Sequence, residues 1–184
     1  MSVEIPASGG TAATPGVEPV RVLVPSRLGN LGVEFVHTAI TRVLIAPAAR
    51  EKKLYFPLSD YEDSEFLDEV FGRISEYLAG ARRSLDLEYD LGPAQLDPFA
   101  RRVLKEAART VYGRTRTYKD VADACGRPDA YRQVVAVLEK NPLPLIIPCH
   151  RILPSKQGLG GYVGGEARKR WLLRLERDNA ALLS

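Results

Sequence analysis

A cysteine and a histidine are adjacent at Cys149 and His150, at the end of a run that contains three prolines. Pro142, Pro144 and Pro148 exclude helix from this run and fix much of its backbone, which holds a nucleophile still. A thiolate is a strong nucleophile, but free cysteine has a pKa of about 8.5, so a neighbouring imidazole is needed to accept its proton near neutral pH. The pair therefore predicts nucleophilic chemistry at Cys149, with His150 as the base.

The two side chains are expected to communicate through a bridging water, because adjacent side chains of extended backbone point to opposite sides. The alternative is that Cys149 is an inert buried residue, as single intracellular cysteines usually are. Cys125, the other cysteine, is followed by Gly-Arg-Pro and is expected to be a turn or core residue. Two cysteines cannot form the disulfide framework of a small secreted domain, which favours a reducing cytoplasm.

Three segments in the first half of the chain have the pattern of β-strands. Residues 20–24 alternate, and residues 32–36 and 41–45 are rich in β-branched side chains, so a small antiparallel sheet is predicted. Between residues 64 and 78 apolar side chains recur every three or four positions, which predicts a helix that covers the sheet. Residues 85–91 alternate again and predict an edge strand.

Composition divides the chain into a tail and two domains. Residues 1–17 have too few large apolar side chains to offset the entropy of ordering them and predict a disordered tail. The Gly92-Pro93 pair breaks the chain between a mixed α/β domain, residues 18–93, and a second domain, residues 94–184. Residues 1–94 hold 9 basic and 14 acidic side chains, a net charge of −5, whereas residues 95–184 hold 17 and 9, a net charge of +8. The basic half predicts a polyanionic partner such as DNA, or alternatively a solvated basic face.

The second half has the pattern of a helical domain. Apolar residues recur at helical spacing from 99 to 107, and Thr117-Tyr118-Lys119-Asp120 is typical of a capping box that begins a short helix. A turn at residues 125–128 and a helix from about residue 129 to residue 140 follow. Two helices joined by a turn predict a helix-turn-helix, or alternatively a plain helical hairpin. No run approaches the roughly 18 apolar residues of a membrane span, so no membrane partner is expected.

Several short motifs of this half stand in a fixed order. Pro148-Cys149-His150-Arg151 is preceded by Asn141-Pro142 and Thr117-Tyr118 and is followed by the glycine-rich loop 160–165 and a segment that ends in Glu176. In this order the motifs resemble those of the O6-alkylguanine-DNA alkyltransferases, also called methylated-DNA–protein-cysteine methyltransferases, over about residues 97–177. The resemblance implies an α+β fold, with an N-terminal small antiparallel sheet and covering helix of ribonuclease H-like type and a C-terminal helical domain with a helix-turn-helix.

The resemblance also implies the activity. The expected reaction is the irreversible, stoichiometric transfer of the alkyl group from O6-alkylguanine to Cys149 after base flipping, with O4-alkylthymine as a second candidate substrate. The product is a thioether that water does not hydrolyse, so each molecule acts once. The expected partner is double-stranded DNA that carries O6-alkylguanine, and the protein is expected to be a cytoplasmic, DNA-associated monomer without cofactors.

Residue roles follow from the resemblance, position by position. Cys149 would be the alkyl acceptor, His150 its base through water, and Glu176 the carboxylate that orients the imidazole. Asn141 would brace the turn, and Tyr118 would protonate or hydrogen-bond N3 of the departing guanine. Arg132 would take the place of the flipped nucleotide, and the other expected DNA contacts are Tyr131, Gln133, Arg151 and Lys119. The residues expected to bind the base are Pro144, Ile152, Tyr162, Val163 and Gly164.

The chain departs from the family pattern in the helix after Arg132. The family has Ala-Val-Gly followed by small residues, whereas this chain has the bulkier run Gln133 to Val137, which predicts a helix that approaches the minor groove less closely. The departure leaves open a second function, a non-enzymatic sensor of alkylated bases that recruits other repair factors, whereas Cys149, His150 and Glu176 together favour the transferase. A zinc site is not expected in the N-terminal half, which has no cysteine and one histidine, His37, an expected strand residue.

Overall fold

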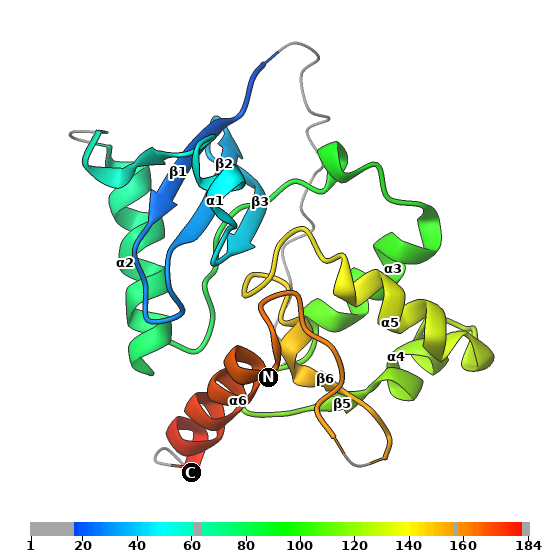
Figure 1. Cartoon of the computed structure of the whole chain (residues 1–184). Coiled ribbons are helices and arrows are strands. Elements are labelled where there is room, and N and C mark those ends of the chain that lie inside the picture. Colours follow the sequence, from blue (N-terminus) through cyan, green and yellow to red (C-terminus); the bar gives the residue numbers. More distant parts are fainter. Residues whose placement is uncertain (1–16, 61–63, 157, 182–184) are drawn as a thin grey trace.

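The first half of the chain forms a sheet with a covering helix, and the second half is mainly helical (Figure 1). The computed structural model describes residues 17–60, 64–156 and 158–181. The predicted tail falls, apart from Val17, on residues 1–16 and so lies outside the described residues. The predicted α+β class is confirmed.

The sheet has four strands in the order β3-β2-β1-β4. The three predicted strands are confirmed as β1 (Val20–Val24), β2 (Leu31–Val36) and β3 (Ala39–Ile45), which pair antiparallel. A two-residue strand, β4 (Phe56–Pro57), pairs in parallel with β1 and was not predicted, because two residues are too few to show alternation. The connection from β3 to α2 also holds α1 (Ala49–Lys52) and the 3₁₀ turn η1 (Leu58–Asp60).

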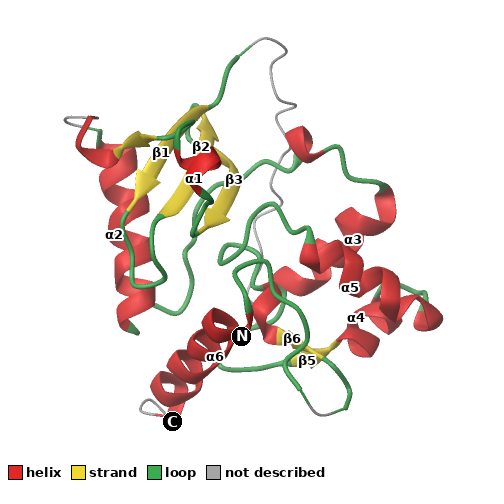
Figure 2. Cartoon of the chain, viewed as in Figure 1, coloured by secondary structure: helices red, strands yellow, loops and turns green. Residues whose placement is uncertain are grey.

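Helix α2 (Glu65–Ala79) covers one face of the sheet, as predicted (Figure 2). The Ser64 hydroxyl caps its first turn by accepting a hydrogen bond from the Leu67 amide. Its buried apolar face packs into the same core as the strands, and the rings of Phe66 and Phe35 lie 4.9 Å apart. The helix therefore supplies one wall of a core whose other wall is the sheet.

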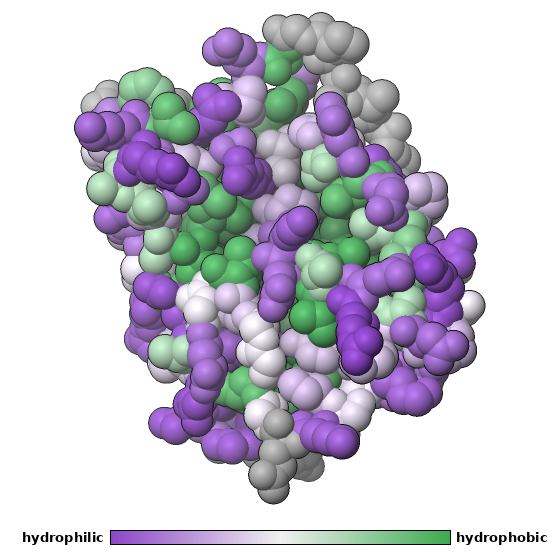
Figure 3. All heavy atoms as spheres, turned by 45° about the vertical axis from the view of Figure 1, so that its right-hand side comes forward, coloured by the Kyte–Doolittle hydropathy of each residue, from purple (hydrophilic) through white to green (hydrophobic). Residues whose placement is uncertain are grey.

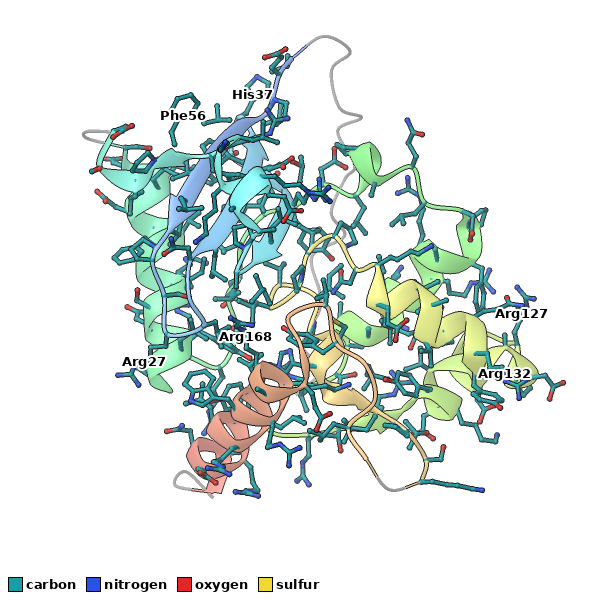
Figure 4. All side chains as sticks on the ribbon, viewed as in Figure 1. Arg27, His37, Phe56, Arg127, Arg132 and Arg168 are labelled. Atoms are coloured by element: carbon teal, nitrogen blue, oxygen red, sulfur yellow. The ribbon has the colours of Figure 1, made fainter. Side chains whose placement is uncertain are left out.

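Two predictions for the first half were wrong. Residues 85–91 are not an edge strand: a single bridge joins Tyr89 to Ile40, and Asp86 interrupts the extended backbone with a φ of 48°. The alternation there reflects the burial of Leu85 and Leu87 rather than strand pairing. His37 lies in the turn between β2 and β3, with a φ of 54°, and is exposed (Figure 4).

Where it is described, the second half contains four longer helices joined by short elements. The helices are α3 (Pro98–Ala108), α4 (Tyr118–Ala124), α5 (Tyr131–Glu139) and α6 (Glu166–Ala181). The short elements are η2 (Gly92–Ala94), η3 (Pro128–Ala130), η4 (Cys149–Arg151) and the parallel strands β5 (Arg116–Thr117) and β6 (Ile152–Leu153). No helix within the described ranges is long and apolar enough to span a membrane.

Helices α4 and α5 form the predicted pair around a tight turn. Thr117 and Asp120 form the predicted capping box at the start of α4. Gly126 has a φ of 71°, a conformation that favours glycine, and its turn brings α5 back against α4 and α3. The helix predicted from about residue 129 begins as η3 and becomes α-helical at Tyr131.

The two halves share one core and are joined by hydrogen bonds to main-chain carbonyls. Most of the buried apolar side chains among the described residues form one cluster that draws on both halves, and Figure 3 shows apolar residues gathered in the middle of one face with hydrophilic side chains around them. The Val43 amide donates to the Pro142 carbonyl at 2.8 Å, and Arg168 reaches the Leu28 carbonyl at 2.8 Å (Figure 4). The sheet therefore braces the proline-rich run, residues 141–148. The domain boundary near Gly92-Pro93 stays a prediction.

Candidate active site

Cys149 begins η4, directly after the proline-rich run, and its side chain is 3% exposed. The Arg151 amide donates to the Pro148 carbonyl at 2.9 Å and closes the turn. The backbone at Cys149 and His150 is therefore not extended, and the geometric reason given for a bridging water was wrong. The route of the proton between the two side chains stays a prediction.

Asn141 holds the ends of the proline-rich run together. Its Nδ2 donates to the Ile147 carbonyl at 2.9 Å and lies 3.1 Å from the Sγ of Cys149, and its Oδ1 accepts from the Leu143 amide at 3.0 Å. The amide is buried, so each of these bonds is made in a low-dielectric interior. This geometry supports the bracing role that the family resemblance implies.

The surroundings of the thiol keep it protonated. Burial raises the pKa of Cys149 to about 11, although the hydrogen bond from Asn141 and the charge of Lys169 oppose the shift. Lys169 is itself buried, donates to the carbonyls of Ile152 and Gly161 at 2.9 and 3.1 Å, and has its pKa lowered by burial to about 8. At neutral pH the thiol therefore needs a base before it can act as a nucleophile.

His150 is placed to be that base. Its Nε2 lies 2.7 Å from the Oε1 of Glu176, and we assign the Nε2 hydrogen to this bond because an ionised carboxylate only accepts. The lone pair of Nδ1 is then available, and no group in the described parts of the chain hydrogen-bonds it. Burial lowers the pKa of His150 and outweighs the opposing effect of Glu176. The imidazole is therefore neutral near pH 7 and able to accept a proton.

Glu176 is 1% exposed, which excludes a surface role for its charge. Its carboxylate accepts from the Tyr77 hydroxyl, from His150, from the Nε of Arg151 at 2.9 to 3.0 Å and from the Gly113 amide at 3.0 Å. Burial alone would raise the pKa of Glu176, but the bonds and charges of His150 and Arg151 lower it to about 2. The carboxylate is therefore ionised throughout the physiological pH range.

Arg151 is 6% exposed, a position that does not favour its predicted contact with DNA, which stays a prediction. Besides the pair with Glu176, its guanidinium donates to the Thr110 carbonyl and to the Tyr77 hydroxyl. A buried carboxylate needs a paired cation, and Arg151 fills that role instead of reaching the surface. Glu176 acts to raise the pKa of His150, but burial, together with the charge of Arg151, acts in the opposite direction and prevails.

Tyr118 faces the glycine-rich loop. Its hydroxyl lies against the backbone of Gly160, where a side chain would collide with it, and Gly160 has a φ of 68° that favours glycine. Burial raises the pKa of Tyr118, so the phenol is neutral and can donate a hydrogen bond. Its contact with a departing base stays a prediction.

Most of the residues predicted to bind the base are buried. Pro144, Ile152 and Gly164 are buried, whereas Val163 is exposed. The ring of Tyr162 stands edge-on to His150 at 6.1 Å. A hollow of about 450 Å³ lies between the loop at Gly113 and α6, away from Cys149. The base contacts of these residues remain predictions.

The residues predicted to contact DNA, apart from Arg151, are exposed. Tyr131, Arg132 and Gln133 lie at the start of α5, where Arg132 points away from the body of the protein (Figure 4). Lys119 is exposed on α4 and pairs with Asp123 at 2.9 Å. These positions support the DNA contacts without testing them.

The two valines of the bulky run in α5 do not lie on its outer face. Val135 and Val137 are partly buried and pack against the core, whereas Ala136, one turn after Arg132, is exposed. The small residue therefore occupies the face that carries the arginine. The two valines therefore face the core, whereas Gln133 of the same run is exposed, and how closely α5 approaches the minor groove stays a prediction.

Sequence reasoning missed Tyr77, Lys169 and the Gly113 amide. Tyr77 lies within the predicted helix 64–78 and counted there only as one of its apolar side chains, although a buried tyrosine usually finds a partner for its hydroxyl. Lys169 lies seven residues before Glu176, on the same face of α6 with the buried Leu172 between them. The lysine could have been found from that spacing once Glu176 was placed inside.

Comparison with known sequences identifies relatives over most of the chain. The family model described as 6-O-methylguanine DNA methyltransferase, DNA binding domain, matches residues 98–178. A methylated-DNA–protein-cysteine methyltransferase of Methanosarcina barkeri is 38% identical over 129 residues, which cover 70% of this chain and 80% of the relative. A protein of the same name from Mycobacterium tuberculosis is 40% identical over 108 residues, 59% of this chain and 64% of the relative.

Solved structures of similar proteins share the arrangement of both halves. The crystal structure of Mycobacterium tuberculosis OGT in complex with DNA matches with a TM-score of 0.75 at 30% identity, covering 86% of this chain and 93% of that chain. The structure of an O6-methylguanine methyltransferase from the same organism matches with a TM-score of 0.75 at 28% identity, covering 91% and 100%. The similarity therefore includes the N-terminal half, where no sequence motif was recognised.

Proposed function

Because the chain belongs to the methylated-DNA–protein-cysteine methyltransferase family, we propose that Cys149 is the residue that accepts the alkyl group of O6-alkylguanine in double-stranded DNA. The protein is a DNA repair enzyme of the single-turnover kind. The observation that carries the assignment is the buried array in which Asn141 braces Cys149 while Glu176 holds His150. O4-alkylthymine is a second candidate substrate, and a cytoplasmic location is proposed from the two free cysteines.

The chemistry begins with the proton of the thiol. The S–H proton of Cys149 passes to Nδ1 of His150, through a bridging water in our proposal, and the imidazolium is stabilised by Glu176. The thiolate attacks the alkyl carbon, an S–C bond forms, and the bond between this carbon and O6 breaks with its electron pair on the guanine. Tyr118 donates a hydrogen bond or a proton to N3 of the departing guanine. The imidazolium of His150 returns its proton to water and the guanine takes up a proton at N1, so the products are a thioether on Cys149 and an unmodified guanine.

The test of this function is the mass of the intact protein after incubation with a duplex that carries O6-methylguanine. One methyl group, about 14 mass units, is expected on each molecule, since the thioether cannot turn over. Peptide fragmentation is expected to place it on Cys149, and an excess of duplex is expected to add no second group. Tight binding to the alkylated duplex with no gain of mass would instead favour a non-enzymatic sensor.

We propose that Arg132 occupies the space that the flipped nucleotide leaves in the duplex. Its exposed position at the start of α5, with Ala136 on the same face, supports this role. The role requires insertion into the stack rather than charge alone.

Arg132→Ala is expected to slow transfer from duplex O6-methylguanine about 10- to 100-fold, because an unfilled stack leaves the unstacking energy uncompensated. Reaction with free O6-benzylguanine is expected to change little, since no base is extruded. Single-turnover rates on the two substrates check both expectations. The matched control is Arg127→Ala, an exposed arginine near the same end of α5 (Figure 4).

A contact to a phosphate would give a different result. The loss of Arg127 is expected to weaken binding to all DNA and to reduce the dependence of affinity on salt, without a selective loss of rate on the duplex. Identical behaviour of the two variants would assign Arg132 to phosphate contact. Equal losses on free base and duplex would assign it to the fold.

A further inference from the structure

Tyr77 brings a hydroxyl from the N-terminal half into the active centre. The residue lies near the end of α2, and its side chain is 1% exposed. Its hydroxyl hydrogen-bonds the Oε1 of Glu176, lies 3.4 Å from the Nε2 of His150 and accepts from Arg151 at 3.4 Å. One phenol from the N-terminal half therefore contacts three residues of the C-terminal half, which contains Cys149.

The direction of the main bond follows from charge. Glu176 is ionised and only accepts, so the hydrogen of the Tyr77 hydroxyl points to Oε1. Burial raises the pKa of Tyr77 well above its ordinary value, with Glu176 acting in the same direction, so the phenol stays neutral. The same oxygen accepts from His150. Tyr77 and His150 therefore share one carboxylate oxygen, and the phenol fixes where that oxygen lies.

We propose that Tyr77 is a positioning residue of the transfer reaction, which holds the Glu176 carboxylate against His150 from the N-terminal half. The inference rests on the proposed function of Cys149 and His150. It adds that the N-terminal half completes the catalytic array through a side-chain hydroxyl, beyond any role in folding.

The proposal predicts a change in the titration of His150. The titratable and charged groups around this imidazole are Tyr77 on α2, Cys149 and Arg151 on η4, Tyr162 in the glycine-rich loop, and Lys169 and Glu176 on α6. Tyr112, before β5, packs against the ring of Tyr77. Of these, Tyr77 and Arg151 share Oε1 with His150. Loss of the Tyr77 hydroxyl leaves more negative charge on Oε1, which favours the imidazolium and raises the pKa of His150.

The variant Tyr77→Phe removes only the hydroxyl. The maximal rate with free O6-benzylguanine is expected to fall about 10-fold, as for the loss of a hydrogen bond to a charged group. The acidic limb of the pH–rate profile is expected to move to higher pH by about half a unit or more. The matched control is Tyr112→Phe, because the Tyr112 ring stacks edge-on against Tyr77 at 5.9 Å while its hydroxyl has no hydrogen-bond partner among the described residues. The control is expected to leave the rate and the profile unchanged.

The titration can be followed without any substrate. The chain has two histidines, so the NMR signals of His150 are assigned by comparison with His37→Gln. Tyr77→Phe is expected to raise the pKa of His150 in this measurement, and Tyr112→Phe is not. A wild-type protein that takes no alkyl group would refute the proposed function, yet the titration would still test the contact.

Two results would overturn the proposal. One is a His150 titration and a transfer rate in Tyr77→Phe that match those of Tyr112→Phe. The other is a fall in thermal stability with an unmoved titration, because that would assign Tyr77 a purely structural role.

Discussion

Cys149→Ser is expected to abolish alkyl transfer while it leaves the fold and the binding of alkylated DNA in place. A hydroxyl is a far weaker nucleophile than a thiolate and is not deprotonated by a neutral imidazole in its ground state. The substitution is nearly isosteric, so the bracing bond from Asn141 is retained. Intact mass after incubation with duplex O6-methylguanine checks the loss, and a gel-shift assay checks binding.

The matched control is Cys125→Ser, at a buried cysteine at the end of α4. Burial raises the pKa of Cys125, and no base is bonded to its sulfur in the described residues, so it is not expected to react. The control protein is expected to gain one methyl group like the wild type. Transfer that survives in Cys149→Ser but not in Cys125→Ser would refute the assignment of the acceptor.

Glu176→Gln is expected to lower the free energy of unfolding by about 3–5 kcal/mol, the usual cost of removing one partner from a buried ion pair. The substitution leaves Arg151 uncompensated in the interior and places an amide NH₂ where four donors meet one carboxylate. The rate of transfer in the folded variant is expected to fall as well, because a neutral glutamine cannot stabilise the imidazolium of His150. Denaturant unfolding at pH 7 and single-turnover rates measure the two effects.

The exposed pair at the start of the same helix is the control. Glu166→Gln breaks the ion pair between Glu166 and Arg170, whose side chains are 64% and 61% exposed, and is expected to cost less than about 1 kcal/mol.

The pH dependence of stability provides a second check on the role of Glu176. The pKa of Glu176 is lowered from 4.5 to about 2 in the folded protein. The ionised carboxylate therefore stabilises the fold above about pH 4.5, and this stabilisation is lost as the pH falls toward 2. The difference in the free energy of unfolding between wild type and Glu176→Gln is therefore expected to shrink over that pH range. A constant difference would contradict the buried ion pair of Glu176 and Arg151.

The elements of the fold were predictable where one face of an element is apolar and the other polar. Strand β1 and helices α2 and α3 have that pattern, whereas β2 and β3 were predicted from their β-branched side chains and α4 from its capping box, all close to their observed bounds. The pattern failed at residues 85–91, where Leu85 and Leu87 are buried without a strand partner. Burial of alternate residues is necessary for such a strand but does not supply a neighbouring strand to pair with.

Helix α6 shows why the surroundings of the site could not be predicted from hydrophobicity. Its buried line is Lys169, Leu172 and Glu176, whereas Trp171 is only partly buried. Two of the three buried residues are charged, because each meets partners from distant parts of the chain. The motif order placed Cys149, His150 and Glu176 together, but the partners of Glu176 depend on tertiary contacts such as that of Tyr77.

The main-chain contact between β3 and the proline-rich run has a consequence for solubility. β3 is an outer strand of the sheet, and such strands present unpaired amides that can recruit a strand of another molecule. Here the Val43 amide is bonded to Pro142 and the Ile40 amide to Glu88. The proline-rich run that leads to Cys149 therefore also covers part of an edge strand that could otherwise pair with another molecule. Variants that loosen this run are expected to self-associate as well as to react slowly.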